Sequence, residues 1–127
     1  MTIVTVADGV ESRIRRNAEM ELKPLSAVLR YKEENSLVTV RIENGKVFLA
    51  RQGDYSLFLP LEEGKTLIGT LGFGSSEGEI SVTAERVGFS LGEKSLLANL
   101  KYTLDFGQEK QKMQIRLNAR EIVSEEK

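Results

Sequence analysis

The sequence LLANLKYTLDF at residues 96–106, followed by MQIRLNA at residues 113–119, decides the fold. A period of two sends successive side chains to opposite faces of a β-strand, so that one face is buried and the other faces water. The two segments therefore predict antiparallel neighbours, and a loop near Glu109-Lys110 predicts that Tyr102 lies opposite Leu117. Their apolar face consists of Leu96, Ala98, Leu100, Tyr102, Leu104, Phe106, Met113, Ile115, Leu117 and Ala119.

The strand before this pair, at residues 80–91, changes the phase of its alternation once. Its apolar residues fall at even positions up to Ala84 and at odd positions from Val87 onward. A β-bulge at Glu85-Arg86 explains the change, because a bulge sets two residues opposite one on the partner strand. With this bulge, Ala84 is predicted to lie opposite Tyr102.

A second hairpin is marked by Asn44-Gly45, the preferred residue pair of a two-residue type I′ turn. The turn lies between two apolar alternating runs and fixes the register of their pairing. Ile42 is predicted to face Val47, and Val38 to face Arg51. Arg51 therefore falls on the same face as the apolar residues.

Further alternating runs, including residues 11–22 and the run that follows Pro24, raise the prediction to eight or nine antiparallel strands. Both a closed up-and-down β-barrel and a β-sandwich fit this pattern. Long strands that pair with their sequence neighbours favour the barrel, which leaves no exposed edges. We expect one barrel domain at residues 1–122, followed by a frayed, charged tail at residues 123–127.

Composition excludes several kinds of chemistry. The chain has 127 residues, a formal net charge of -1, and neither cysteine nor histidine. Disulfides, a Ser-His-Asp triad and the usual zinc sites are therefore impossible within one chain. We expect a non-enzymatic protein with no cofactor and no metal. The sequence shows neither a signal-peptide pattern nor a long apolar run, so we expect a cytoplasmic location.

Short motifs do not change this expectation. Gly64-Lys65-Thr66 matches the end of a phosphate-binding loop, but Leu59 stands where that motif requires glycine. The acidic pairs Glu33-Glu34 and Glu62-Glu63 fall in turns, where we expect them to be solvated. A basic stripe on the last strand lacks the interleaved aromatic rings of a nucleic-acid surface, so neither nucleic acid nor membrane is expected as a partner. The stripe consists of Lys110, Lys112, Arg116 and Arg120.

Arg51 is the leading candidate for a ligand-binding residue. An inward arginine near the end of a barrel strand can neutralise an anionic head group through a bidentate hydrogen bond. Alternatively, its stem covers the core while its head reaches water or pairs with a nearby acid. Tyr31, Tyr55 and Tyr102 are also predicted to point inward, either toward a ligand or simply as packed core residues.

The outward-facing residues allow another interpretation. Phe48 and Phe58 are predicted to lie on the outer face, where clustered aromatic rings are unusual for a monomer. They would suit an interaction module that docks a protein partner or a second copy of the chain.

The sequence also resembles a known family in the order and spacing of several segments. These are Leu29-x-Tyr31-x-Glu33, Arg51-Gln52-Gly53, Phe73-Gly74, Gly78-Glu79-Ile80-Ser81-Val82-Thr83 and Leu100-Lys101-Tyr102-Thr103-Leu104. They resemble the YwiB-like family of bacterial proteins, over roughly residues 29–122. The resemblance implies a calycin-type β-barrel, similar in shape to lipocalins, and a domain of unknown function. It supports the barrel and supplies no activity or catalytic residue.

Together, these observations predict a small, non-catalytic β-barrel whose lumen binds a small amphipathic or anionic molecule, with Arg51 at one mouth. The alternative is self-association or protein binding through the outer face around Phe48 and Phe58, with a homodimer as one form. The sequence does not identify the ligand.

Overall fold

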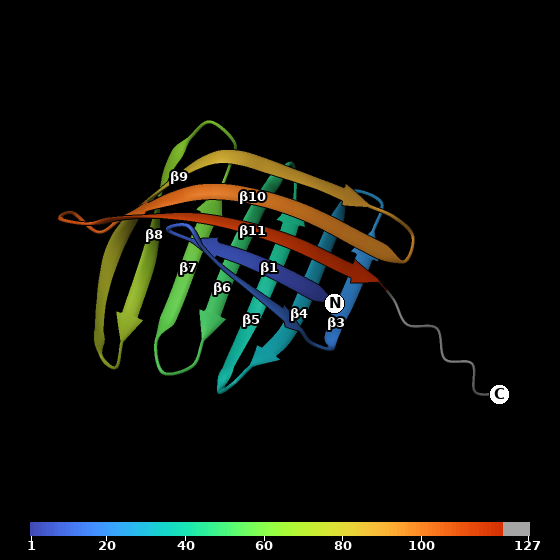
Figure 1. Ribbon diagram of the computed structural model, residues 1–127, viewed down its shortest axis with the longest axis horizontal. Coiled ribbons are helices and arrows are strands. Elements are labelled where there is room, and N and C mark those ends of the chain that lie inside the picture. Colours follow the sequence, from blue (N-terminus) through green and yellow to red (C-terminus); the bar gives the residue numbers. More distant parts are fainter. Residues whose placement is uncertain (121–127) are drawn as a thin grey trace.

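The computed structural model describes residues 1–120 and contains eleven β-strands in one antiparallel sheet, with no helix among those residues (Figure 1). The predicted tail at residues 123–127 lies outside the described residues. The strands are β1 (Thr2–Ala7), β2 (Val10–Arg15), β3 (Ala18–Lys23), β4 (Ser26–Glu33), β5 (Ser36–Glu43), β6 (Lys46–Gln52), β7 (Ser56–Leu61), β8 (Thr66–Phe73), β9 (Ser76–Leu91), β10 (Ser95–Asp105) and β11 (Lys110–Arg120).

The strand order confirms the all-β, up-and-down architecture. The order is β2-β1-β11-β10-β9-β8-β7-β6-β5-β4-β3, so every neighbouring pair except β1 and β11 is also adjacent in sequence. The predicted count of eight or nine strands is too low. The first strand was not predicted, and residues 11–22 form two strands separated at Arg16-Asn17. The even-numbered alternation continues across this break from Ile14 to Ala18, which hides it in the sequence.

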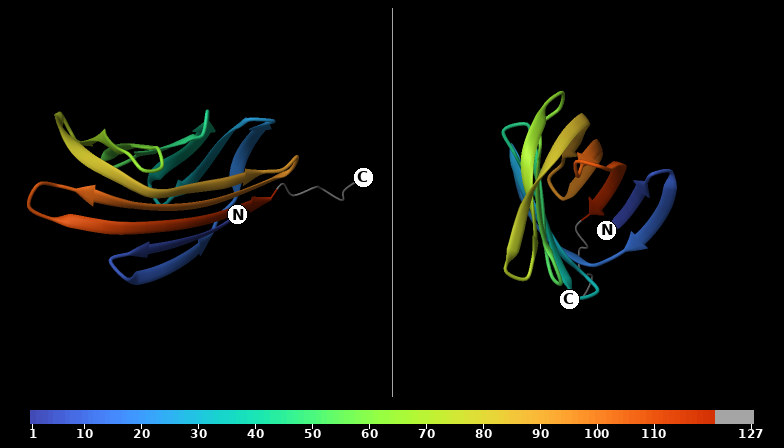
Figure 2. Two further views of the ribbon diagram at one scale, coloured as in Figure 1. Left: turned by 90° about the horizontal axis from the view of Figure 1, so that it is seen from above. Right: turned by 90° about the vertical axis from the view of Figure 1, so that its left-hand side faces the viewer.

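The sheet curls into a half-barrel with two walls (Figure 2). One wall contains β3 to β8, and the other contains β10, β11, β1 and β2, while the long strand β9 runs between them. The edge strands β2 and β3 are joined by Arg16-Asn17 but do not pair with each other. The sheet is therefore open, because its backbone hydrogen bonds do not form a closed ring. This differs from the prediction of a barrel without edges.

The predicted bulge lies where β9 leaves one wall for the other. Lys101 is paired with Arg86, and the next residue, Tyr102, is paired with Ala84, so that Glu85 is the extra residue. A bulge bends and twists its strand. The bulge in β9 therefore helps to turn the sheet at the corner of the half-barrel.

Three strand pairs have predicted registers, and the β9–β10 pairing of Ala84 with Tyr102 is confirmed, whereas the other two differ in outcome. The pairing about Asn44-Gly45 is confirmed, and both turn residues have the positive φ that a type I′ turn requires, 53° and 77°. The β10–β11 register is wrong by four residues, because Tyr102 lies opposite Met113. The reversal occurs earlier than predicted, where the Phe106 amide donates to the Glu109 carbonyl at 2.9 Å.

The core lies between the two walls and consists mostly of predicted alternating positions, to which the structure adds Leu61 of β7 and Ile3 of the unpredicted strand β1. An even register shift keeps every side chain on its face, so the error in β10–β11 leaves the predicted inner face intact except for Phe106, which is in the turn and exposed. The core residues with the least exposure are Leu29, Ile42, Val47, Leu59, Leu61, Val82, Leu96 and Leu100.

Candidate ligand site in the barrel lumen

The structure brings the predicted site residues together. Arg51, Tyr31, Tyr55 and Tyr102 all line one cavity of about 290 Å³ between the walls of the half-barrel. Most of the remaining lining is apolar. It includes Val38, Val40, Leu49, Leu57, Leu59, Leu100, Met113, Ile115 and Leu117. The volume is at the lower end of the range of about 300–1,000 Å³ that is typical of small-molecule sites.

Strand register places Arg51 on the inner face. Tyr31 of β4 pairs with Val38 of β5, which pairs with Arg51 of β6, which in turn pairs with Leu57 of β7. The four residues form one row across the inner face, because directly paired residues of neighbouring strands point to the same side. The turn at Asn44-Gly45 fixes which residues of β6 point inward, and Arg51 is one of them.

Arg51 is held by a carboxylate and an aromatic ring. Its Nη1 donates to Oε1 of Glu33 at 3.2 Å, and both side chains are about one-quarter exposed. Its guanidinium carbon lies 5.5 Å from the centre of the Tyr55 ring, within the range of a cation–π contact. Its Nε is buried and has no hydrogen-bond partner among the described residues. A buried donor without an acceptor is unfavourable, because its interaction with water has been lost and not replaced.

Glu33 is a site residue that the sequence reasoning missed. Its position next to Glu34 suggested a solvated turn acid, whereas it is the last residue of β4 and pairs with Arg51. The signal was available in the alternation. Glu33 follows Tyr31 by two residues, so it lies on the same inner face.

Tyr31 and Tyr102 approach the cavity from opposite walls and remain neutral at physiological pH. The pKa of Tyr31 is raised to about 12, mainly by burial and also by the charge of Glu33, while Arg51 and Arg16 oppose the shift. Burial also raises the pKa of Tyr102 well above its ordinary value, and Tyr31 adds to this effect. Both phenols are therefore suited to hydrogen bonding in their protonated form.

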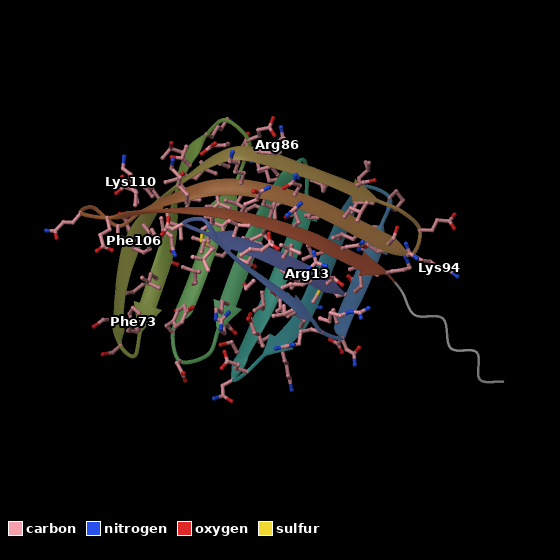
Figure 3. All side chains as sticks on the ribbon, in the orientation of Figure 1. Arg13, Phe73, Arg86, Lys94, Phe106 and Lys110 are labelled. Atoms are coloured by element: carbon pink, nitrogen blue, oxygen red, sulfur yellow. The ribbon has the colours of Figure 1, made fainter. Side chains whose placement is uncertain are left out.

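Tyr55 belongs to the turn between β6 and β7 rather than to a strand. Its ring centre lies 5.7 Å from that of Phe73, which is seen toward the left end of the sheet in Figure 3. The ring is thus held between Phe73 on one side and the Arg51 guanidinium on another. This contact fixes an aromatic side chain beside the polar group of the cavity.

Thr5 of β1 and Ser12 of β2 add two hydroxyl-bearing side chains to the cavity. They were missed because β1 was not predicted and its pairing with β11 joins the two ends of the chain. The cavity therefore combines an apolar lining with one ion pair, three phenols and two hydroxyl groups. Such a combination can bind a molecule that has both an apolar part and a polar head.

The described residues show neither a metal-binding cluster nor a membrane-spanning helix. Within residues 1–120, no three histidine, cysteine, aspartate or glutamate side chains gather to hold a metal ion. No helix in this part of the chain is long and apolar enough to cross a membrane.

Comparisons with known proteins agree on one family and one fold. The model of a family described as a domain of unknown function, DUF1934, matches residues 3–117. No curated protein matches the chain. The crystal structure of the ywiB protein from Bacillus subtilis is similar, with a TM-score of 0.74 and 18% sequence identity, over 95% of this chain and 89% of that chain. At this identity the likeness shows a shared fold.

Proposed function

Since the chain belongs to the DUF1934 family, the YwiB-like domain of unknown function that its sequence resembles, we propose a function from its own geometry. The half-barrel is a non-catalytic binding protein that takes a small amphipathic molecule into its lumen. The polar head of this molecule lies at Arg51, and its apolar part lies against the lining near Leu100 and Ile115. The proposal includes the cytoplasmic location expected from the sequence.

The observation that carries this proposal is the buried Arg51 Nε without an acceptor. Glu33 uses only Nη1, which leaves the edge formed by Nε and Nη2. That edge of a guanidinium is the one that matches the two oxygens of a carboxylate or phosphate. Because Glu33 already balances the charge of Arg51, the site suits a head group with one negative charge better than a polyanion. A short-chain carboxylate has this chemistry.

The absence of histidine and cysteine supports a non-catalytic role, since these are the commonest acid–base and nucleophilic side chains. The tyrosines of the cavity support it too. A phenol whose pKa is raised to about 12, as for Tyr31, is a poor general base at neutral pH. These groups suit recognition better than proton transfer.

Native mass spectrometry of the protein as purified is the first test. A mass excess that is lost on denaturation supports a bound ligand and identifies it. Isothermal titration of the protein with butanoate, hexanoate and octanoate follows. We expect affinity for carboxylates to rise with chain length until the lumen is full, because each added CH₂ buried contributes about 0.8 kcal/mol.

Three variants separate the role of the fork from that of charge. Arg51→Met removes the guanidinium but keeps an apolar stem, and Arg51→Lys keeps the charge but loses the fork. We expect both to weaken carboxylate binding by about tenfold or more, since hydrogen bonds to charged groups contribute about 1.5–3 kcal/mol. Arg41→Met, on the outer face of neighbouring β5, is the matched control and should bind as the wild type does. Unchanged affinity in Arg51→Met, or no carboxylate binding by the wild type, contradicts the proposal.

A specific observation favours a second candidate, self-association through the outer face. Phe48 and Phe58 are stacked with ring centres 6.0 Å apart, and Phe58 is 41% exposed. Single exposed apolar residues are ordinary, but an exposed ring stacked on a second, partly buried ring is a compact contact surface. Sedimentation equilibrium over a range of concentrations tests this candidate. A dimer that Phe58→Lys dissociates supports it, and a monomer at all concentrations contradicts it.

A further inference from the structure

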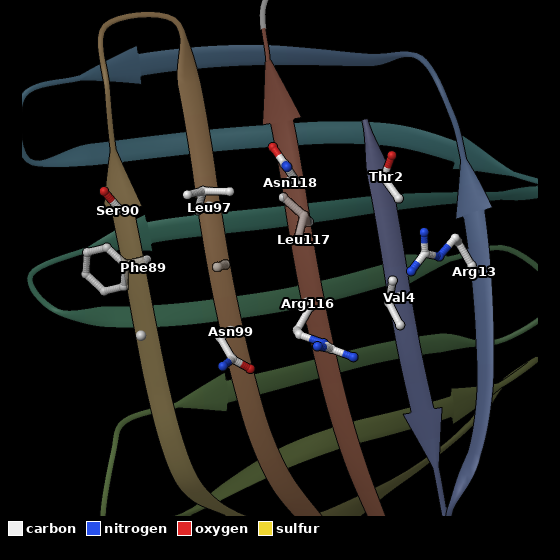
Figure 4. Close-up of a pocket in the computed structure, with 12 residues that line it drawn as sticks. Thr2, Val4, Arg13, Phe89, Ser90, Leu97, Asn99, Arg116, Leu117 and Asn118 are labelled. Atoms are coloured by element: carbon white, nitrogen blue, oxygen red, sulfur yellow. The ribbon is translucent and has the colours of Figure 1, made fainter.

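A second hollow, of about 620 Å³, lies on the outer face of the wall formed by β9, β10, β11, β1 and β2 (Figure 4). The side chains that line it differ in chemistry from those that line the lumen. Its lining contains two arginines and several neutral polar side chains, and no aspartate or glutamate. Part of this surface is the basic stripe that contains Arg116, for which the sequence predicts neither a nucleic-acid nor a membrane partner.

The strand register sets the two arginines on either side of one residue. Arg116 of β11 pairs with Val4 of β1, and Val4 pairs with Arg13 of β2. With neighbouring strands about 4.8 Å apart, the two arginine backbones are about 10 Å apart. Figure 4 shows both side chains leaning toward β1, from opposite sides of Val4. Two guanidinium groups are thus placed to reach one ligand between them.

The burial of Val4 is consistent with this convergence. Val4 is only 8% exposed although its paired partners, Arg13 and Arg116, both point outward into solvent. The aliphatic stems of arginine side chains cover neighbouring apolar residues in this way while their charged heads stay in water. The stems therefore keep the two heads over the same spot of the sheet.

Neither arginine has a carboxylate partner within residues 1–120. Among the described residues, no ion pair involves Arg13 or Arg116. The acid on the same face of β2 is Glu11, which lies one outward position away, opposite Val6. Two like charges that converge without a counter-ion repel each other, and an anion bound between them relieves this repulsion.

Neutral hydrogen-bonding groups lie next to the two arginines. Thr2 pairs with Asn118, one outward position from Val4 and Arg116. On the other side of Arg116 is its partner Asn99, whose Oδ1 accepts from Gln114 Nε2 at 3.4 Å and so leaves the amide nitrogen as a donor. Gly88, the partner of Asn99 on β9, has no side chain, so nothing from this position fills that end of the hollow.

We propose that this outer hollow binds the phosphate group of a small phosphorylated molecule. Arg13 and Arg116 clamp the phosphate from two sides, and Thr2 and Asn118 donate to its remaining oxygens. A tetrahedral group with several acceptor oxygens and more than one negative charge matches two cationic forks and several neutral donors better than a carboxylate does. The inference does not depend on the proposed lumen ligand.

The test uses paired probes and NMR amide shifts of the full chain at low ionic strength. The probes are inorganic phosphate, adenosine 5′-monophosphate and adenosine. We expect phosphate and the monophosphate to shift the amides of Thr2, Val4, Arg13, Arg116 and Asn118, and adenosine to leave them unchanged. The lumen amides near Arg51 should not move, which distinguishes this site from the one proposed above.

Variants decide whether the clamp is specific. Arg13→Gln and Arg116→Gln should each weaken monophosphate binding about tenfold or more, in keeping with the loss of a charge-assisted hydrogen bond. Arg120→Gln is the matched control, because Arg120 is exposed on the same face of β11 but does not line the hollow. Both arginines of the clamp are exposed, so the variants should unfold at the wild-type temperature.

Three results would overturn the proposal. One is the absence of phosphate-dependent shifts in these amides. Another is an equal loss of affinity in Arg120→Gln, which means that binding reflects only the general charge of β11. The third is tight binding of a single-stranded oligonucleotide without binding of the monophosphate, which means that the surface recognises a nucleic-acid backbone instead.

Discussion

Arg51 and Arg116 lie on opposite faces of the same sheet and occupy opposite environments. Arg51 points into the lumen, pairs with Glu33 and contacts the ring of Tyr55. Arg116 points outward, is exposed, and forms no ion pair with the described residues. The inner face balances its charges, and in the proposed function it selects a ligand by apolar contact and by the Arg51 Nε donor that has no acceptor. The outer face leaves positive charge unbalanced, and in the proposed phosphate site it selects by electrostatic attraction, which salt weakens.

A single strand supplies both environments, because alternate residues point to opposite faces. On β10, Leu100 and Tyr102 line the lumen, while Leu97 and Asn99 line the outer hollow. Mutations at neighbouring positions of this strand should therefore have different consequences.

The largest expected difference is in stability. Leu100 is 1% exposed and Leu97 is 49% exposed. Leu100→Ala should lower the free energy of unfolding by about 2–5 kcal/mol, since it removes buried methyl groups and leaves a cavity. Leu97→Ala should change it by about 0.5 kcal/mol or less. Urea unfolding followed by circular dichroism measures both, and equal losses would show that the two faces are not distinct.

The next largest expected effect is a loss of folding stability at alkaline pH, caused by Tyr31 on the inner face. The folded-state pKa of Tyr31 is raised from 10.0 to about 12, so its contribution is fully present below pH 10 and is lost as the pH rises toward 12. The loss reaches about 2 kcal/mol, because the unfolded state releases its phenolic proton first. Tyr31→Phe should lose less stability than the wild type between neutral pH and about pH 11. The same pH dependence in both proteins would assign the alkaline loss to other groups.

The contrast between the two hairpins explains how much of the fold could be predicted. Asn44-Gly45 fixes the turn, so the β5–β6 register follows residue by residue. The β10–β11 loop has no such pair, and alternation alone fixes the face but not the register. The side of the sheet that Tyr102 occupies was therefore predictable, whereas its partner Met113 was not.

The lumen site and the outer hollow also differ in how far the sequence predicts them. Arg51, Tyr31 and Tyr102 could be identified because local alternation sends each of them inward, whereas Tyr55 reaches the same cavity from the turn after β6. The outer hollow was not identified, because it requires β1 to pair with β11 across the whole length of the chain. The existence of β1 has a local signal, the β-branched run at residues 2–6 followed by the turn pair Asp8-Gly9, but its pairing with β11 has none. Long-range pairing is thus the information that the strand patterns do not contain.

The smallest expected effects are the coupling energies of the two arginines with their charged neighbours. These energies should differ in sign, and therefore in how added salt changes stability. A double-mutant cycle of Arg51→Met and Glu33→Gln should give a favourable coupling of about 0.5–1 kcal/mol, which is typical of an ion pair with partial exposure. A cycle of Arg13→Gln and Arg116→Gln should give an unfavourable coupling of at most about 0.5 kcal/mol, because the two like charges repel each other across β1.

Added salt should reduce both coupling energies, and the outer one more completely, because exposed charges are screened more than partly buried ones. Salt therefore makes the wild type less stable relative to the inner variants and more stable relative to the outer ones. Urea unfolding midpoints at low and high ionic strength measure both trends. If the two cycles respond to salt with the same sign, then Arg13 and Arg116 do not repel each other, and the unbalanced charge on which the outer site depends is absent.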